Sequence, residues 1–224
     1  AASIVRVTDP LLRTQFRQIS NNMDNATYQK ALNGGQAQSL GHAYIESCAE
    51  FLVFCMDSHR HSQLVPDAQL DWAEVTLIGA IDAALLAQNI MVAAESLGLG
   101  GVYIGSLRND IERAGTLLNL PKHVVPLFGM CLGHPIRRES NEEAVEASKA
   151  KQRPRLPMSV LVSENQYQPA SEEVLADYNE QVKQYYHERS NKDMDWRQQI
   201  QATFAKPVRP YILPYLQQQG FVKR

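Results

Sequence analysis

The chain has 224 residues, of which 44% are hydrophobic and 21% are charged, and its formal net charge is -2. These values are ordinary for a soluble protein with one sizeable domain, and they give no electrostatic basis for binding nucleic acid or an anionic membrane. The longest apolar stretch, residues 75–99, is interrupted by polar side chains. We therefore interpret it as a buried helix and not as a membrane span.

The first part of the chain predicts short elements and one polar excursion. Alternating apolar and polar residues indicate strands, apolar residues at helical spacing indicate helices, and continuous apolar runs indicate buried strands. In chain order these patterns predict a strand at 3–8, a helix beginning at Asp9-Pro10, a polar excursion at 21–40 with room for one short helix, a short helix at 42–50 and a buried strand at 51–56. Because a domain seldom begins with a core strand, we expect a further segment upstream of Ala1.

The second part begins with the longest predicted helix, residues 70–97. Apolar residues surround much of it, so we expect it to be the central core helix. The same patterns then predict strands at 102–104 and 124–132, a helix at 109–119, a charged loop at 136–152, a short strand at 159–162, and helices at 172–188, 195–205 and 210–219. This alternation predicts an α+β or α/β sandwich around a small sheet, with a core at 1–170 and a helical extension at 171–224.

The cysteines and histidines do not suggest a metal site or a disulfide framework. Cys48, Cys55 and Cys131 make an odd count without CxxC spacing, and each has apolar neighbours. We expect small buried side chains and a reduced, cytoplasmic setting. His59 and His61 lack a third ligand of suitable type and spacing, so no metal is predicted.

A glycine-rich stretch, GLGGVYIGSLRND at 98–110, has two interpretations. It differs from the GxGxxG dinucleotide fingerprint, because a helix precedes the glycines and a strand follows them. In the simpler interpretation the glycines end a helix before a strand and a turn. In the functional one, Gly105-Ser106 lets the backbone approach a flat ligand, and Arg108 and the following helix N-terminus point toward it.

Arginines in two polar segments are candidate phosphate ligands. Arg153 and Arg155 stand two apart in the proline-stiffened string RPRLP, so both side chains project to one side. Two guanidinium groups suit a phosphate dianion, although surface salt bridges are the usual role of such a pair. Arg189 lies in the polar break HERSNKD, where it is either a solubilising charge or a nucleotide-phosphate contact.

Several strings, in order along the chain, carry a family resemblance. They are SIVRVTD, AEFLVFC, AAESLGLGGVYIGSLRN, LFGMCLGHP, PRLP, ENQYQ and RPYILPYL. On these strings the chain resembles the NADPH-dependent flavin reductases of luminous bacteria and the related oxygen-insensitive nitroreductases. The resemblance implies an α+β fold with a mostly antiparallel sheet wrapped by helices, in an intertwined homodimer with FMN at the interface.

The resemblance also implies roles for particular residues. Arg153 and Arg155 match the basic pair that holds the FMN phosphate, and Arg189 matches an arginine that helps select NADPH over NADH. The segment beside the flavin ring comprises Tyr103, Ile104, Gly105, Ser106, Leu107 and Arg108. The cofactor carries the redox chemistry, so no catalytic side chain is assigned.

The chain departs from the family pattern in three places. The HRSxR motif and the serine-rich loop that hold FMN in the family have no counterpart in this sequence. The excursion at 21–40 looks like an insertion, and the loop at 136–152 is longer than usual. The family glutamine at the flavin pyrimidine edge falls at His42 in a gap-free alignment or at Gln36 if the GGQ string is aligned, and we prefer His42.

The resulting hypothesis is an enzyme that transfers hydride from NADPH through bound FMN to a small-molecule acceptor. The acceptor would be free flavin, a nitroaromatic or a quinone. The alternative hypothesis is a non-catalytic or flavin-poor dimeric binding protein on the same scaffold, and the missing HRSxR motif is its support. The colour of bound flavin separates the two.

Overall fold

The computed structural model describes residues 1–35, 40–135 and 153–224, which form two compact units. The first unit comprises residues 1–135 and 209–224, and the second comprises residues 136–208. Both predicted loop segments are affected, because the loop at 136–152 and four residues of the 21–40 excursion lie outside the described residues.

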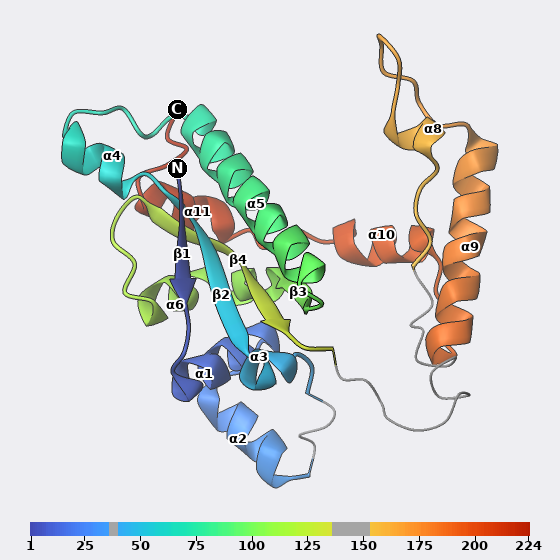
Figure 1. Ribbon diagram of the computed structural model, residues 1–224, viewed down its shortest axis with the longest axis horizontal. Helices are drawn as coiled ribbons and strands as arrows, with labels where there is room; N and C mark the ends of the chain where they lie inside the picture. Colours follow the sequence, from blue (N-terminus) through green and yellow to red (C-terminus); the bar gives the residue numbers. More distant parts are fainter. Residues whose placement is uncertain (36–39, 136–152) are drawn as a thin grey trace. The chain divides into compact units, whose positions relative to one another are not determined.

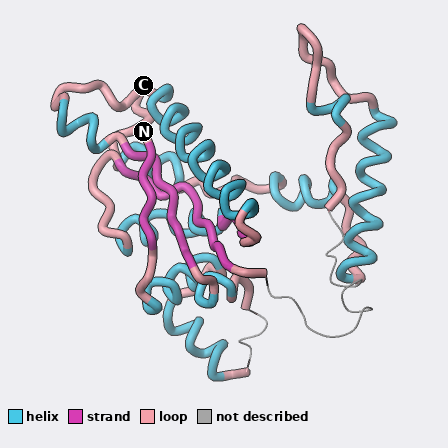
Figure 2. The backbone as a smooth tube through the Cα atoms, viewed as in Figure 1, coloured by secondary structure: helices cyan, strands magenta, loops and turns pink. Residues whose placement is uncertain are grey.

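The first unit is built on a four-stranded sheet with the strand order β1-β2-β4-β3 (Figure 2). Its strands are β1 (Ala2–Arg6), β2 (Glu50–Asp57), β3 (Gly100–Ile104) and β4 (Val124–Gly133), and every pairing is antiparallel. The register places Val53 opposite Gly129, and Ile104 opposite the same glycine on the other side. The structure therefore confirms the predicted antiparallel sheet with helices around it.

Short helices near the amino end begin where the sequence supplies caps. The Asp9 side chain accepts from the Leu11 backbone N–H and starts α1 (Pro10–Ser20), and Asp24 caps α2 (Asn25–Asn33) in the same way. The short helix α2 lies inside the predicted excursion. Further on come α3 (Tyr44–Ser47), where a short helix was predicted, and α4 (His59–Leu64), which the sequence analysis did not predict.

The longest helix, α5 (Ala73–Ser96), lies along one face of the sheet (Figure 1). Only a stripe of mostly small residues is buried there, namely Gly79, Ala83, Ala87, Met91 and Ala94. A Cβ on Gly79 would lie 2.8 Å from Cβ of Met56, so the missing side chain permits this close approach. The prediction of a central core helix is wrong for the single chain, because large apolar side chains on α5 remain exposed.

These exposed side chains give α5 its apolar character. They are Leu77, Ile78, Ile81, Leu85, Leu86 and Val92. Among the described residues, α5 is the one helix long and apolar enough to cross a membrane by length and composition, and 28% of its apolar 18-residue stretch is buried. Core helices of soluble proteins share this length and composition, so the feature alone does not indicate a membrane span.

The opposite face of the sheet carries the main core of the first unit. Phe16, Phe51 and Leu107 are fully buried there, and the Phe16 and Phe51 rings meet edge to face at 5.5 Å. The 3-10 helix η1 (Gly105–Asp110) and α6 (Ile111–Leu117) follow β3 and pack beside α1. The carboxyl-terminal helix α11 (Ile212–Gln218) belongs to this unit, and Phe221 beyond it is fully buried.

The second unit consists of helices in its described part. They are α8 (Met158–Leu161), α9 (Glu172–Ser190) and α10 (Trp196–Phe204). The Tyr178 ring of α9 meets the Trp196 ring of α10 edge to face at 5.0 Å. The predicted strand at 159–162 is wrong, because these residues form most of α8 and the start of the loop after it. The predicted helices at 172–188 and 195–205 are confirmed.

Candidate functional site

The segment from the end of β3 through η1 presents backbone more than side chains. Ile104 and Leu107 are buried in the core, so a contact from either residue to a ligand would come from its backbone. Tyr103 is partly exposed, and its hydroxyl donates to Oε1 of Gln88 at 3.0 Å. The Ser106 hydroxyl oxygen is buried and lacks a hydrogen-bond partner among the described residues. Among the described residues, this strip therefore offers one unpaired hydroxyl, that of Ser106.

Arg108 is turned back onto its own segment. Its guanidinium donates to the Leu127 carbonyl, and a Cβ on Gly105 would lie 3.4 Å from its Nη2 atom. Burial lowers the pKa of Arg108, and the nearby charge of Arg209 lowers it further. The predicted approach of Arg108 to a ligand stays a prediction, because its guanidinium here bonds a carbonyl of β4.

The carboxyl-terminal string RPYILPYL, to which the sequence pattern gave no role beyond the family resemblance, contacts η1. The Arg209 guanidinium donates twice to Oδ1 of Asn109, at 2.8 and 3.2 Å. The Tyr211 hydroxyl lies 3.1 Å from the Arg108 carbonyl oxygen and 2.7 Å from that of Asn109. These bonds fasten the end of the chain to η1. The resemblance of this string to the family was the sequence feature that could have pointed to these contacts.

His42 stands in a loop that buried polar groups hold in place. Arg17 donates to the carbonyls of Leu40 and Gly41 at 3.3 Å and forms an ion pair with Glu46 of α3. The backbone of His42 is left-handed, with φ of 59°, and its Nδ1 lies 2.8 Å from the Tyr44 hydroxyl. Burial lowers the pKa of His42, and the charge of Arg17 lowers it further. The imidazole is therefore neutral at neutral pH. The alternative position, Gln36, lies outside the described residues.

In the second unit, two predicted arginines rest on neighbouring tyrosine rings of α9. The Cζ atom of Arg153 lies 5.9 Å from the Tyr186 ring centroid, and that of Arg189 lies 5.7 Å from the Tyr185 ring centroid. The two rings meet edge to face at 5.3 Å. Arg153 also donates to Oε1 of Gln199, and Arg189 donates to the Tyr185 hydroxyl at 2.8 Å. The structure thus places these two arginines over two tyrosine rings that contact each other.

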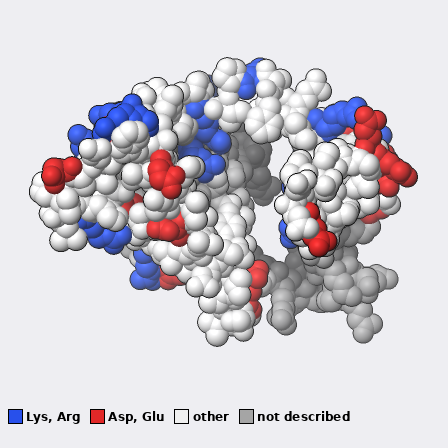
Figure 3. Space-filling model, turned by 90° about the horizontal axis from the view of Figure 1, so that it is seen from above, with Lys and Arg blue, Asp and Glu red and all other residues white. Residues whose placement is uncertain are grey.

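Positive charge on this unit is available for a ligand. Arg153, Arg155 and Arg189 are exposed, and none forms an ion pair with a carboxylate among the described residues. Figure 3 shows basic and acidic side chains in small separate groups on the face that it presents. On that face, positive charge is therefore local and forms no broad basic field.

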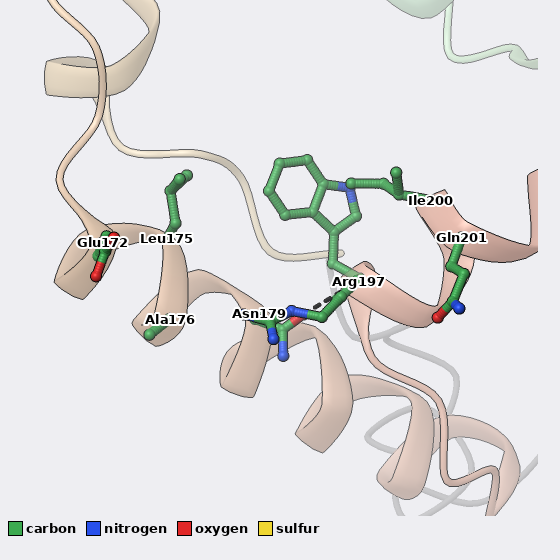
Figure 4. Close-up of a pocket in the computed structure, with 8 residues that line it drawn as sticks. Glu172, Leu175, Ala176, Asn179, Arg197, Ile200 and Gln201 are labelled. Atoms are coloured by element: carbon green, nitrogen blue, oxygen red, sulfur yellow. Dashed lines mark hydrogen bonds between the residues drawn. The ribbon is translucent and has the colours of Figure 1, made fainter. Parts of the chain in front are cut away.

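A pocket of about 690 Å³ lies between α9 and α10 of the second unit (Figure 4). Leu175, Trp196 and Ile200 give it an apolar wall, and Glu172, Asn179 and Arg197 give it polar groups. The Arg197 backbone N–H donates to Oδ1 of Asn179 at 2.8 Å, which joins the two helices. None of the predicted cofactor-binding residues lines this pocket.

Two family models match the chain. The model described as the nitroreductase family covers residues 26–134, and the model described as the nitroreductase family, C-terminal domain, covers residues 153–224. The first match contains His42 and the segment from Tyr103 to Arg108. The second contains all three predicted phosphate-binding arginines.

Curated relatives and a solved structure match along the whole chain. The chain is 46% identical to an oxygen-insensitive NADPH nitroreductase of Salmonella typhimurium, over 100% of the chain and 81% of the relative. It is 44% identical to an NADPH-flavin oxidoreductase of Vibrio harveyi, over 99% of the chain and 81% of the relative. The structure of the Vibrio harveyi NADPH:FMN oxidoreductase complexed with NAD+ matches with a TM-score of 0.77 at 42% identity, covering 100% of the chain and 81% of that structure. The chain therefore belongs to the nitroreductase family.

Proposed function

We propose that this protein is an NADPH-dependent FMN oxidoreductase that reduces free flavin, nitroaromatics or quinones. The observation that carries the proposal is the match along the whole chain to two NADPH-dependent enzymes, at 46% and 44% identity. One of these relatives is named for nitro reduction and the other for flavin reduction. Both activities consist of hydride transfer from the same nucleotide to a small acceptor.

The residues present fit FMN. A flavin ring needs close backbone approach and polar groups at its edge. The strip at Tyr103–Arg108 would supply the backbone approach, and its Ser106 hydroxyl, which is unpaired among the described residues, supports the proposal. The phosphate needs cations without a competing carboxylate, and Arg153 and Arg155 meet that condition among the described residues. When bound, FMN supplies the hydride-accepting and hydride-donating chemistry. The chain binds, orients and shields it.

Individual side chains have distinct roles in this proposal. Arg153 and Arg155 would hold the FMN phosphate by charge-assisted hydrogen bonds. Arg189 would pair with the ribose 2′-phosphate of NADPH and so favour it over NADH. The neutral imidazole of His42 would bond the pyrimidine edge of the flavin, and the Tyr44 hydroxyl would fix its orientation.

The active form would be a homodimer located in the cytoplasm. The apolar face of α5 supports the dimer, because Ile81 and Leu85 are 56% and 66% exposed in the single chain. A monomeric soluble protein rarely leaves so large an apolar patch in water, and a second copy of the same helix can cover it. Free thiols at all three cysteines fit a reducing compartment.

The test is direct. The purified protein is mixed with FMN, freed of excess cofactor, and its visible absorption recorded, and NADPH oxidation is then followed with each class of acceptor. We expect a yellow protein that oxidises NADPH faster than NADH. A protein that retains no flavin and oxidises neither nucleotide would contradict the proposal and favour the non-catalytic binding protein.

A further inference from the structure

Two of the three cysteines lie where β2 begins and β4 ends. Cys48 follows α3 and precedes β2, and Cys131 lies in β4 opposite Phe51 of β2. Cys48 packs against the core cluster that contains Cys131, and its Sγ donates to the Ile45 carbonyl at 3.7 Å. Cys131 is buried at 3% exposure, whereas Cys48 is only partly buried. The pair therefore combines a thiol that a small solvent molecule can reach with a partner that it cannot.

Arg13 places a buried positive charge beside Cys48. Its guanidinium donates to the carbonyls of Val7 at 2.9 Å and Cys48 at 2.6 Å, and its Nη1 atom lies 4.0 Å from Sγ of Cys48. Arg13 is 8% exposed and forms no ion pair with a carboxylate in the part of the chain that the structure describes. A thiolate on Cys48 would be the nearest negative charge for it.

The surroundings give the two thiols different acidities. The hydrogen bond from Cys131 and the charge of Arg13 lower the pKa of Cys48 to about 7, against opposing effects of burial and Glu50. The same hydrogen bond and burial raise the pKa of Cys131. Cys48 is therefore partly ionised at neutral pH, while Cys131 keeps its proton and donates it to the bond.

Cys55 shows what a structural cysteine looks like in this fold. It is fully buried in β2, and burial together with Asp57 raises its pKa to about 12. It therefore stays protonated and shielded, as buried structural thiols do. The difference between Cys55 and Cys48 lies in their surroundings, since the residue type is the same.

We propose that Cys48 and Cys131 form a reversible oxidation site for hydroperoxides, with Cys48 as the attacking thiol and Cys131 as the resolving one. The Cys48 thiolate attacks a peroxide oxygen, the O–O bond breaks, and hydroxide or alkoxide leaves, so that Cys48 becomes a sulfenic acid. The Cys131 sulfur then attacks the Cys48 sulfur and the S–O bond breaks. An S–S bond forms, and the Cys131 proton leaves with the hydroxyl group as water. The two thiols supply the two electrons that reduce the peroxide.

The disulfide would join the residue after α3 to β4. Dithiol reductants would reverse it by thiol–disulfide exchange. The proposal needs neither FMN nor NADPH, so its failure and the failure of the proposed function are separate outcomes. It concerns a modification site on the first unit alone.

The test uses the full chain, reduced and then treated with hydrogen peroxide. Alkylation under denaturing conditions and intact mass should show two blocked thiols and the loss of two hydrogen atoms, both reversed by dithiothreitol. The Cys55→Ala variant is the matched control, because only Cys48 and Cys131 remain in it and it should behave like the wild type. Before oxidation, Cys48 should react with iodoacetamide at least about a hundredfold faster than Cys55 at neutral pH.

Single variants separate the two roles. In Cys131→Ser, the sulfenic acid on Cys48 should persist and be trapped by dimedone, and in Cys48→Ser peroxide should leave the remaining thiols unchanged. A wild-type protein that gains oxygen on Cys48 while Cys131 stays free would overturn the proposal, as would a disulfide found only between two copies. The wild-type measurement decides the matter even if a serine variant fails to fold.

Discussion

Arg153 and Arg155 are exposed cations two residues apart, and the proposed phosphate site depends on both. A charge-assisted contact contributes roughly 1.5–3 kcal/mol, so removing both should weaken FMN binding by about 100-fold to 10,000-fold. We predict this loss for the double variant Arg153→Ala, Arg155→Ala. Flavin fluorescence titration measures it, and Arg197→Ala, which removes another exposed guanidinium of the same unit, should bind FMN normally. Unchanged flavin affinity in the double variant would exclude the phosphate role.

Arg189 is expected to discriminate between nucleotides that differ only in the 2′-phosphate. The Arg189→Ala variant should raise the KM for NADPH by about 10-fold to 100-fold and leave the NADH reaction nearly unchanged. Steady-state kinetics with both nucleotides measure the difference. Because Arg189 also donates to the Tyr185 hydroxyl, Tyr185→Phe serves as the control, and it should keep the NADPH preference. Equal losses with both nucleotides would point to a structural role instead.

Sequence patterns predicted the chemical type of single residues better than the direction in which their side chains point. They singled out Arg153 and Arg189 as cations, and the structure adds the tyrosine rings beneath them. Leu107 was predicted beside the flavin from its place in a family string, yet its side chain is fully buried in the core. A string of letters does not tell which way a side chain points, because that depends on distant elements packed around it.

At the scale of elements, α5 is the informative case. Its apolar residues surround the helix, and this pattern predicts burial but not what does the burying. The same dehydration of Ile81 or Leu85 can come from the chain's own core or from a second subunit. The sequence therefore predicted the helix correctly and its surroundings incorrectly.

The wrong strand prediction at α8 has a different cause. SVLV favours a strand, but no strand lies in the described part of that unit, so Val160 and Val162 bond to Pro157 and Met158 within a single turn.

The dimer proposal gives a prediction about α5. Charges placed at its exposed apolar face should be strongly disfavoured at a dry interface, so Ile81→Asp with Leu85→Asp should yield monomers. Sedimentation velocity should report twice the chain mass of 25.2 kDa for the wild type and the single mass for this variant. Leu64→Asp on α4 is the control, because Leu64 is 85% exposed but lies away from α5, and it should stay dimeric. A wild-type monomer at micromolar concentration would refute the proposal.

At the scale of the whole molecule, two histidines should make stability depend on pH. Burial lowers the pKa of both His42 and His123, and the charges of Lys122, His59 and Lys223 lower that of His123 further. Their ordinary value is 6.5, so the unfolded chain takes up protons first as the pH falls below it. The contribution of these two histidines to stability should be constant above that value and decline below it.

The histidines and the carboxylate Glu46 affect stability in different pH ranges. Burial raises the pKa of Glu46, but hydrogen bonds from Thr14 and Arg17 outweigh it and hold the pKa below its ordinary value of 4.5. The contribution of Glu46 to stability is therefore lost only as the pH falls below that value. As the pH is lowered from 6.5 to 4.5, the ordinary pKa values of histidine and of Glu46, the Tm should therefore fall because of the histidines. His123→Asn removes one of them and suits the left-handed backbone there, where φ is 66°. Its Tm should fall less over this window, and an identical pH profile would refute the assignment.

The predicted boundary at residue 170 separates a cofactor core from a helical extension, and it remains a proposal about function. Contacts divide the chain differently, because residues 209–224 return to the first unit after the second is complete. Composition could not reveal this return. Apolar residues such as Tyr215 and Phe221 look the same whether they pack nearby or against strands far away in sequence.

That return has a consequence for how the chain is made. Tyr215 and Phe221 fill a core cluster with Met56 of β2, Ile111 of α6 and Val125 of β4. On the ribosome, the sheet can assemble once β4 has emerged, but this cluster stays open until Tyr215 and Phe221 have been translated. During that interval the nascent first unit exposes the apolar ends of β2 and β4. Emergence of Phe221, and not formation of the sheet, is then the step that closes the first unit.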